Sequence, residues 1–230
     1  MIHALFFDLN GVIIDDEPIH LEAYREALQG VGIDLTDEDY FASLGMDDPT
    51  FVRAAFGRAG RPLDDETMQA VIAREAELHL TRIKDELPLA SGIVNFLKIA
   101  ARSFQLGVVS MAERVEVDYV LEHAAVAGLF TVIISAEDVS ACKPDPACYE
   151  LALSRLNQIR RERRQLPLLA NECLVVEDSP PGIASGRAAG MRTIGVTNTV
   201  AEAALRAAGA DVVTANMGDW GVDAVHHLFS

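Results

Sequence analysis

The stretch that decides the fold is LFFDLNGVIID, residues 5–15. Its apolar start is typical of a buried parallel strand, and Gly11 permits the tight turn with which such a strand ends. We therefore predict that Asp8 lies at the carboxyl end of this strand, at the edge where open α/β sheets bind their ligands. Taken alone, Asp8 could equally be a turn-forming residue, so the rest of the chain has to separate these two interpretations.

Further apolar runs along the chain have the length and composition of strands. They are residues 106–110, 131–134, 173–176, 193–196 and 211–213. Helix-forming segments lie between them, near residues 93–101, 113–124, 145–160, 181–189 and 200–208. Strands that alternate with helices at this spacing predict an α/β fold with a Rossmann-like, doubly wound parallel sheet.

The segment that follows the first strand is different, because it contains helix-forming sequence and no strand pattern. Helix starts are expected at Glu17-Pro18, at Thr36, at Pro49 as a first helical position, and at residues 64–66. We therefore predict two domains. An all-helical cap domain comprises residues 16–87, and a Rossmann-like core comprises residues 1–15 and 88–230.

Composition narrows the classes of partner. Acidic residues outnumber basic residues 35 to 19 in a chain of 230, which gives a formal net charge of −16. This charge argues against nucleic acid and against an anionic membrane surface as partners. The three cysteines lack metal-type spacing, and the sequence shows neither a signal peptide nor an apolar run of transmembrane length. We expect a cytoplasmic protein, with a monomer as the default assembly.

Polar side chains follow four of the predicted strands. They are Asp8 and Asn10 after the first, Ser110 after the second, Lys143 in the loop after the third, and Glu177 and Asp178 after the fourth. Because the carboxyl ends of parallel strands meet at one edge of a sheet, these side chains are expected to converge despite their separation in sequence.

The carboxylates of this set are suited to a magnesium ion. Asp8, Glu177 and Asp178 offer the hard oxygen ligands that Mg²⁺ prefers. Glu177 and Asp178 are adjacent in sequence, and two neighbouring carboxylates repel each other unless a cation or hydrogen-bond donors are present. The sequence therefore predicts a Mg²⁺ site at this edge of the sheet.

The remaining residues of the set are suited to phosphoryl transfer. Ser110 and the backbone N–H groups of Met111 and Ala112, at the start of the next helix, could hold phosphate oxygens. Lys143 could reduce the repulsion between a carboxylate nucleophile and a phosphoryl group. Asp8 would then attack phosphorus and form an aspartyl-phosphate.

In this order the motifs resemble those of the haloacid dehalogenase superfamily, in its phosphatase and β-phosphoglucomutase-like branch with a helical cap. Residues 8–12 are similar to the first motif of the family, Ser110 to the second, Lys143 to the third, and Glu177-Asp178 to the fourth. The resemblance implies a Mg²⁺-dependent phosphohydrolase for a small phosphorylated metabolite, with a sugar phosphate as the expected kind.

Asn10 departs from the pattern of the family. The family's phosphotransferases carry an aspartate there, which acts as general acid and then as general base. Asparagine has no titratable proton, so a loss of roughly 10²–10⁴-fold in turnover is expected, while its backbone carbonyl could still bind Mg²⁺. Asn10 is either a deliberate change that slows turnover or a native residue of a protein with altered or no activity. The intact remainder of the site favours the first explanation.

The cap residues bear on the kind of reaction. His20 resembles a histidine of sugar-phosphate mutases and related phosphatases, although it could also be an ordinary helix-face residue near the hinge. Gly45 belongs to a loop, residues 44–47, that is expected to face the core and contact substrate. Because Asp47 and Asp48 make this region acidic, it would repel a bisphosphate, which favours hydrolysis of a monophosphate over phosphomutase action.

Three other classes of function fit the sequence less well than a phosphohydrolase. Dehalogenase chemistry needs no Mg²⁺ and would leave Glu177 and Asp178 without a use. Phosphonatase chemistry relies on a cap lysine near the site, whereas Lys84 lies near the cap–core linker. A non-catalytic protein that binds a phosphorylated metabolite is the alternative from another class, and Asn10 is the residue that keeps it open.

Overall fold

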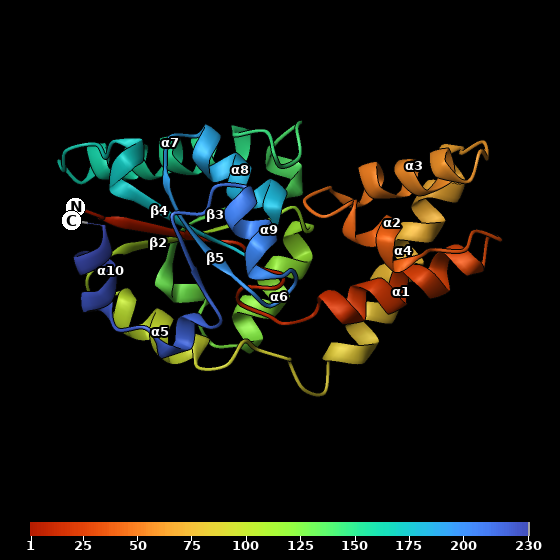
Figure 1. Ribbon diagram of the computed structural model, residues 1–230, viewed down its shortest axis with the longest axis horizontal. Helices are drawn as coiled ribbons and strands as arrows, with labels where there is room; N and C mark the ends of the chain where they lie inside the picture. Colours follow the sequence, from red (N-terminus) through yellow and green to blue (C-terminus); the bar gives the residue numbers. More distant parts are fainter. Residues whose placement is uncertain (230) are drawn as a thin grey trace.

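The computed structural model describes residues 1–229 and contains a six-stranded parallel sheet with helices on both faces (Figure 1). The strands are β1 (Ala4–Phe7), β2 (Gln105–Val109), β3 (Phe130–Ile134), β4 (Cys173–Glu177), β5 (Arg192–Val196) and β6 (Val212–Thr214). Their order across the sheet is β3-β2-β1-β4-β5-β6, and every neighbouring pair is parallel. The predicted Rossmann-like α/β fold is confirmed.

Two helical layers cover the sheet. One contains α7 (Ala147–Glu162), α8 (Pro180–Ala188) and α9 (Glu202–Ala207), and the other contains α5 (Ile93–Ala100), α6 (Arg114–His123) and α10 (Val222–Leu228). Short 3₁₀ turns occur at Ala127–Leu129, Ala136–Asp138, Ala170–Glu172 and Met217–Asp219. Because side chains alternate along a strand, Phe7 packs in the core cluster of α5 and α6, whereas Phe6 packs in the cluster of α7.

A separate group of four helices lies beside the carboxyl edge of the sheet (Figure 1). It consists of α1 (Glu17–Gln29), α2 (Asp37–Phe41), α3 (Asp48–Arg58) and α4 (Asp65–Ile83). These helices have a hydrophobic core of their own, which includes Leu28, Phe51 and Val52. We refer to α1–α4 as the helical group.

Side-chain caps fix the starts of three of these helices. Thr36 accepts a hydrogen bond from the Asp39 N–H at 3.1 Å, and Asp64 begins α4 in the same way. Helix α3 begins at Asp48, because the Asp47 carboxylate accepts from the Thr50 N–H at 2.9 Å and is the capping residue. The prediction that Pro49 is the first helical residue is therefore wrong by one position.

Two chain segments connect the helical group to the sheet, and they pair with each other. The Asp15 N–H donates to the Pro88 carbonyl at 2.7 Å, and the Ala90 N–H donates to the Ile13 carbonyl at 3.0 Å. The predicted domain boundaries lie in this paired stretch. None of the helices within residues 1–229 has both the length and the apolar content needed to cross a membrane.

Candidate active site

The central position of β1 gathers the polar residues at one edge of the sheet. Phe7, the last residue of β1, is in register with Val108 on one side and with Val176 on the other. Asp8 therefore lies between the end of β2, where Ser110 follows, and Glu177 at the end of β4. The structure brings these three residues together, as expected for a parallel sheet.

Lys143 is the centre of the charged network at this edge. Its Nζ lies 2.8 Å from Asp8 Oδ2 and 2.6 Å from Glu177 Oε1, and it donates to the Val109 carbonyl at 3.1 Å. Burial opposes the charge of Lys143, but the two carboxylates outweigh burial and raise its pKa. Lys143 is thus a buried ammonium group that bridges two strand ends.

The two acidic residues of the fourth motif are buried behind Lys143. The Tyr149 hydroxyl donates to Glu177 Oε1 at 2.6 Å, and the Thr199 hydroxyl donates to Asp178 Oδ2. Burial raises the pKa of Glu177 to about 7, with the charge of Asp8 adding to the effect, and burial also raises the pKa of Asp178. Additional positive charge would stabilise the ionised form of these buried carboxylates.

The three carboxylates fit a magnesium ion. Oxygens of Asp8, Glu177 and Asp178 lie within 4.8 Å of one another, and an all-oxygen donor set is the kind that Mg²⁺ selects. Gly11 allows this close arrangement, because its φ is +71° and a Cβ there would lie 1.9 Å from Asp178 Oδ2. The donor set is therefore chemically suited to the predicted cofactor.

The Asn10 side chain lies among hydrogen-bond acceptors. Its Nδ2 is 3.1 Å from Glu116 Oε1, 3.1 Å from Asp16 Oδ2 and 3.1 Å from His20 Nε2. Its Oδ1 accepts from the Ser110 hydroxyl at 3.4 Å. The position is thus surrounded by groups that complement an amide NH₂, and it carries no group that could transfer a proton.

The side of the site expected to hold phosphate is formed by the turn after β2. Ser110 is buried, and its hydroxyl oxygen accepts from the Ala112 N–H at 3.0 Å. The amide of Ala112 is therefore already engaged, which sequence reasoning did not foresee. Met111 lines the same cavity beside Ser110 and Ala112.

A loop of the helical group closes over this edge of the sheet. Gly45 has a φ of +80°, and a Cβ there would lie 2.9 Å from Pro181 Cγ and 3.2 Å from Lys143 Cβ. One cavity is shared by the two parts of the molecule. Its lining includes Asp8, Asn10, Ser110, Met111, Ala112 and Lys143 from the sheet side, and Glu17, His20, Gly45 and Asp48 from the helical group. Glu177 and Asp178 are not among the lining residues.

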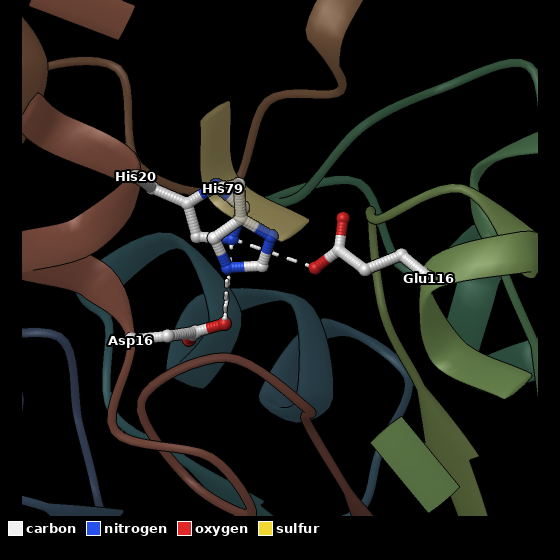
Figure 2. A group of neighbouring side chains, drawn as sticks. All are labelled: Asp16, His20, His79 and Glu116. Carbon is white, nitrogen blue, oxygen red and sulfur yellow. Dashed lines mark hydrogen bonds and ion pairs between the residues drawn. The ribbon is translucent and has the colours of Figure 1, made fainter. Parts of the chain in front are cut away.

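His20 belongs to a cluster of titratable side chains that the sequence did not reveal. Figure 2 shows it together with Asp16, His79 and Glu116. Burial would raise the pKa of Asp16, but the two histidines outweigh it and lower this pKa to about 2. His20 similarly lowers the pKa of Glu116. Sequence spacing gave no signal for His79 or Glu116, because each is one of several polar residues on an amphipathic helix.

Comparisons with known proteins agree with this geometry. The sequence profile of haloacid dehalogenase-like hydrolases matches residues 2–190. The chain belongs to this family. As a member of the haloacid dehalogenase-like hydrolases it is 30% identical over 207 residues to protein CbbY of Rhodobacter capsulatus, with 83% of each chain covered. It is 26% identical over 193 residues to fructose-1-phosphate phosphatase YqaB of Escherichia coli, covering 84% of this chain and 95% of that one.

Two further proteins are similar to nearly the whole chain, but the chain spans very different shares of their length. The chain is 27% identical over 225 residues to the protein SUPPRESSOR OF QUENCHING 1, chloroplastic, of Arabidopsis thaliana, which takes in 95% of this chain but spans only 20% of that protein. The crystal structure of β-phosphoglucomutase from Clostridium difficile superposes with a TM-score of 0.86 at 20% identity, covering 100% of this chain and 97% of that one. The superposition establishes the fold that this haloacid dehalogenase-like hydrolase shares with that structure.

Proposed function

We propose that this haloacid dehalogenase-like hydrolase is a Mg²⁺-dependent phosphohydrolase for a small phosphorylated metabolite, with a sugar monophosphate as substrate, and that Asn10 slows its turnover. The observation that carries the proposal is the Lys143 ammonium group between Asp8 and Glu177, next to a cavity that Asp8 lines. The similarity to a fructose-1-phosphate phosphatase supports a sugar phosphate as the substrate class.

In the proposed reaction an Asp8 carboxylate oxygen attacks phosphorus, and the bond from phosphorus to the sugar oxygen breaks. The charged Lys143 lowers the repulsion between Asp8 and the incoming phosphoryl oxygens. Asp8, Glu177 and Asp178, with the Asn10 backbone carbonyl, would hold Mg²⁺, which neutralises phosphoryl charge when bound. Water then attacks the aspartyl-phosphate, releases phosphate and regenerates Asp8.

Proton transfer is the step that Asn10 impairs. The departing sugar oxygen needs a proton, and the attacking water must lose one, but an amide can serve in neither role. Solvent has to supply and accept these protons instead, so both chemical steps slow down while binding is retained. A loss of roughly 10²–10⁴-fold relative to an aspartate at this position is expected.

The same cavity supports monophosphate hydrolysis over phosphomutase action. Asp48 lines it, hydrogen-bonded to the Tyr24 hydroxyl, and the adjacent Asp47 caps α3. Arg58 approaches the lining residue Ser43, and its guanidinium is bound to Ser43 Oγ at 2.9 Å and to Asp39. This guanidinium is already paired, so a second phosphate would have to compete for it.

The test is to place an acid at position 10. The Asn10→Asp variant is assayed for phosphate release from a panel of phosphorylated metabolites with Mg²⁺. Because a carboxylate at position 10 would face Glu116, the double variant with Glu116→Gln is assayed in parallel. We expect a gain of roughly 10²-fold or more in kcat in at least one of the two, and no activity when Asp8→Asn is added.

The absence of any gain in both variants would contradict the phosphohydrolase proposal. If these variants instead bind a sugar phosphate in a Mg²⁺-dependent manner without releasing phosphate, the protein is a non-catalytic phosphometabolite-binding protein. The proposal also includes a cap of residues 16–87 over a core of residues 1–15 and 88–230, a monomeric assembly and a cytoplasmic location. Size-exclusion chromatography and cell fractionation test the last two.

A further inference from the structure

Four side chains from the start of α1, from α4 and from α6 converge between the helical group and the sheet (Figure 2). Asp16 directly precedes α1, His20 lies on α1, His79 on α4 and Glu116 on α6. We propose that these four residues form a binding site for a divalent transition-metal ion of the Zn²⁺ class, and that the bound ion fastens the helical group to the sheet. This proposal goes beyond the phosphohydrolase function and does not depend on it.

The spacing of the donor atoms fits a tetrahedral ion. His20 Nε2 lies 3.4 Å from Asp16 Oδ2 and 3.4 Å from Glu116 Oε1, and His79 Nε2 lies 3.0 Å from Asp16 Oδ2. Zn–N and Zn–O bonds of about 2.0–2.2 Å imply ligand-to-ligand distances of about 3.3–3.6 Å in a tetrahedron. The two 3.4 Å separations match this range, and the 3.0 Å separation of His79 from Asp16 would have to widen. One ligand atom from each of the four residues lies within 4.8 Å of the others, so small side-chain rotations complete the geometry.

The orientation of His20 is that of a metal ligand. Its Nδ1 pairs with Glu75 Oε1 at 2.9 Å, and Glu75 is not one of the four proposed ligands. An imidazole whose Nδ1–H donates to a carboxylate presents the lone pair of Nε2 in the opposite direction, which here is toward Asp16, Glu116 and the Asn10 amide. This carboxylate–histidine arrangement accompanies histidine ligands in most metal sites.

The charge balance of the cluster also calls for a cation. Within residues 1–229, the ion pairs of Asp16, Glu75 and Glu116 are formed with the two histidines and with no lysine or arginine. The two imidazole rings are stacked with centroids 3.8 Å apart, so positive charge on both rings would be unfavourable. A divalent ion offsets two of the three carboxylate charges without placing charge on the imidazoles.

The donor set separates this site from the predicted magnesium site. Two imidazole nitrogens with two carboxylates suit Zn²⁺ and related first-row ions, whereas the oxygens of Asp8, Glu177 and Asp178 suit Mg²⁺. Asn10 reaches into the cluster, where its Nδ2 donates to Asp16 and Glu116 and lies 3.1 Å from His20 Nε2. The ion would displace these contacts, and a half-turn of the amide would turn Oδ1 toward the ion and give up the hydrogen bond from Ser110.

Calorimetric titration with Zn²⁺ in millimolar Mg²⁺ tests the site. We expect one equivalent to bind with a Kd of about 1 µM or tighter. His79→Phe keeps the stacked ring and removes the metal-binding nitrogen. Glu116→Gln removes a charge at a half-buried position. Each variant should bind Zn²⁺ at least about tenfold more weakly. His123→Gln, at an exposed histidine, and Asp178→Asn, in the predicted magnesium site, should both retain the affinity of the parent chain.

Two further readouts do not depend on catalysis. Co²⁺ bound to the parent chain should show the visible absorption of a tetrahedral complex, and Zn²⁺ should raise its Tm. Both effects should be lost in His79→Phe and in Glu116→Gln. No binding in the micromolar range, or unchanged binding in both variants, would overturn the proposal and identify the cluster as a hydrogen-bonded network without metal. Loss of binding in Asp178→Asn alone would overturn it too, because the ion would then occupy the other site.

Discussion

Lys143 is the residue on which the charge balance of the candidate active site depends. Replacing it with alanine leaves Asp8 and Glu177 close together without their shared cation. Removing one partner of a buried ion pair costs about 3–5 kcal/mol, so the Lys143→Ala variant should lose stability of this order in denaturant titrations without Mg²⁺. Phosphate release by Asn10→Asp protein should be abolished by the same change.

The matched control is Lys98→Ala, because Lys98 is exposed on α5. This variant should unfold within about 0.5 kcal/mol of the parent chain. Mg²⁺ should reduce the loss of unfolding free energy in Lys143→Ala, since the ion supplies positive charge to the same carboxylates. Equal stability of the two lysine variants without Mg²⁺ would contradict this account of Lys143.

At Asn10, the sequence predicts the chemical function of the residue, and the structure adds the identity of its neighbours. The sequence predicts that the position lacks a proton-transferring group, because that follows from the residue type alone. It does not predict that Asp16 and Glu116 accept hydrogen bonds from the amide. These carboxylates would repel an aspartate at position 10, whereas the His20 imidazole beside it would attract one.

At the scale of elements, the capping of α3 controls the loop that carries Gly45. Asp47 accepts a hydrogen bond from the Thr50 N–H and so satisfies one free amide of the first turn. Asp47→Ala should lower the free energy of unfolding by about 1 kcal/mol, whereas Asp47→Ser should retain most of it, because both residues are good caps. Urea titration compares the two, and equal losses would argue against a capping role.

The start of α3 also makes stability depend on pH. Burial raises the pKa of Asp48 to about 7, although the hydrogen bond from Tyr24 opposes the shift. Between pH about 4 and about 7 the folded protein keeps a proton that the unfolded chain has lost. The stability that Asp48 contributes is therefore fully present below pH about 4 and is lost as the pH rises toward 7.

Asp48→Asn removes this titration and keeps an acceptor for the Tyr24 hydroxyl. The gain in stability of the variant over the parent chain should be larger at pH 8 than at pH 5, as measured by thermal unfolding of both proteins at both pH values. Asp85→Asn, at an exposed position between α4 and α5, serves as the control and should show no such difference. A pH-independent effect of Asp48→Asn would contradict the shifted pKa.

Elements close to the motifs could be predicted, and contacts between distant elements could not. The strand ends at Asp8, Ser110 and Glu177 follow from apolar runs and from the geometry of parallel sheets. The meeting of His79 with Asp16 depends on how α4 rotates against α1, which is decided by packing across about sixty residues of chain. Tyr149 likewise reaches Glu177 because of the way α7 packs on the sheet. That contact cannot be predicted from the local sequence.

At the scale of the whole molecule, the net charge of −16 opposes the approach of an anionic substrate. Salt shortens the range of this repulsion, because the Debye length falls from about 30 Å at 0.01 M to about 8 Å at 0.15 M. For Asn10→Asp protein acting on a sugar monophosphate, kcat/KM should rise over this range of ionic strength while kcat stays constant. A fall in kcat/KM would indicate that local positive charge dominates the encounter.

The hydrogen bonds that hold the Asn10 side chain have a consequence for how samples age. Asparagine followed by glycine deamidates when the glycine nitrogen attacks the side-chain carbonyl carbon. In the folded chain, that nitrogen donates to the Ile14 carbonyl at 2.7 Å and the amide is held by its acceptors. Conversion of Asn10 to aspartate should therefore proceed mainly in unfolded molecules. Phosphatase activity that emerges on storage would then depend on how frequently the protein unfolds and not on storage time alone.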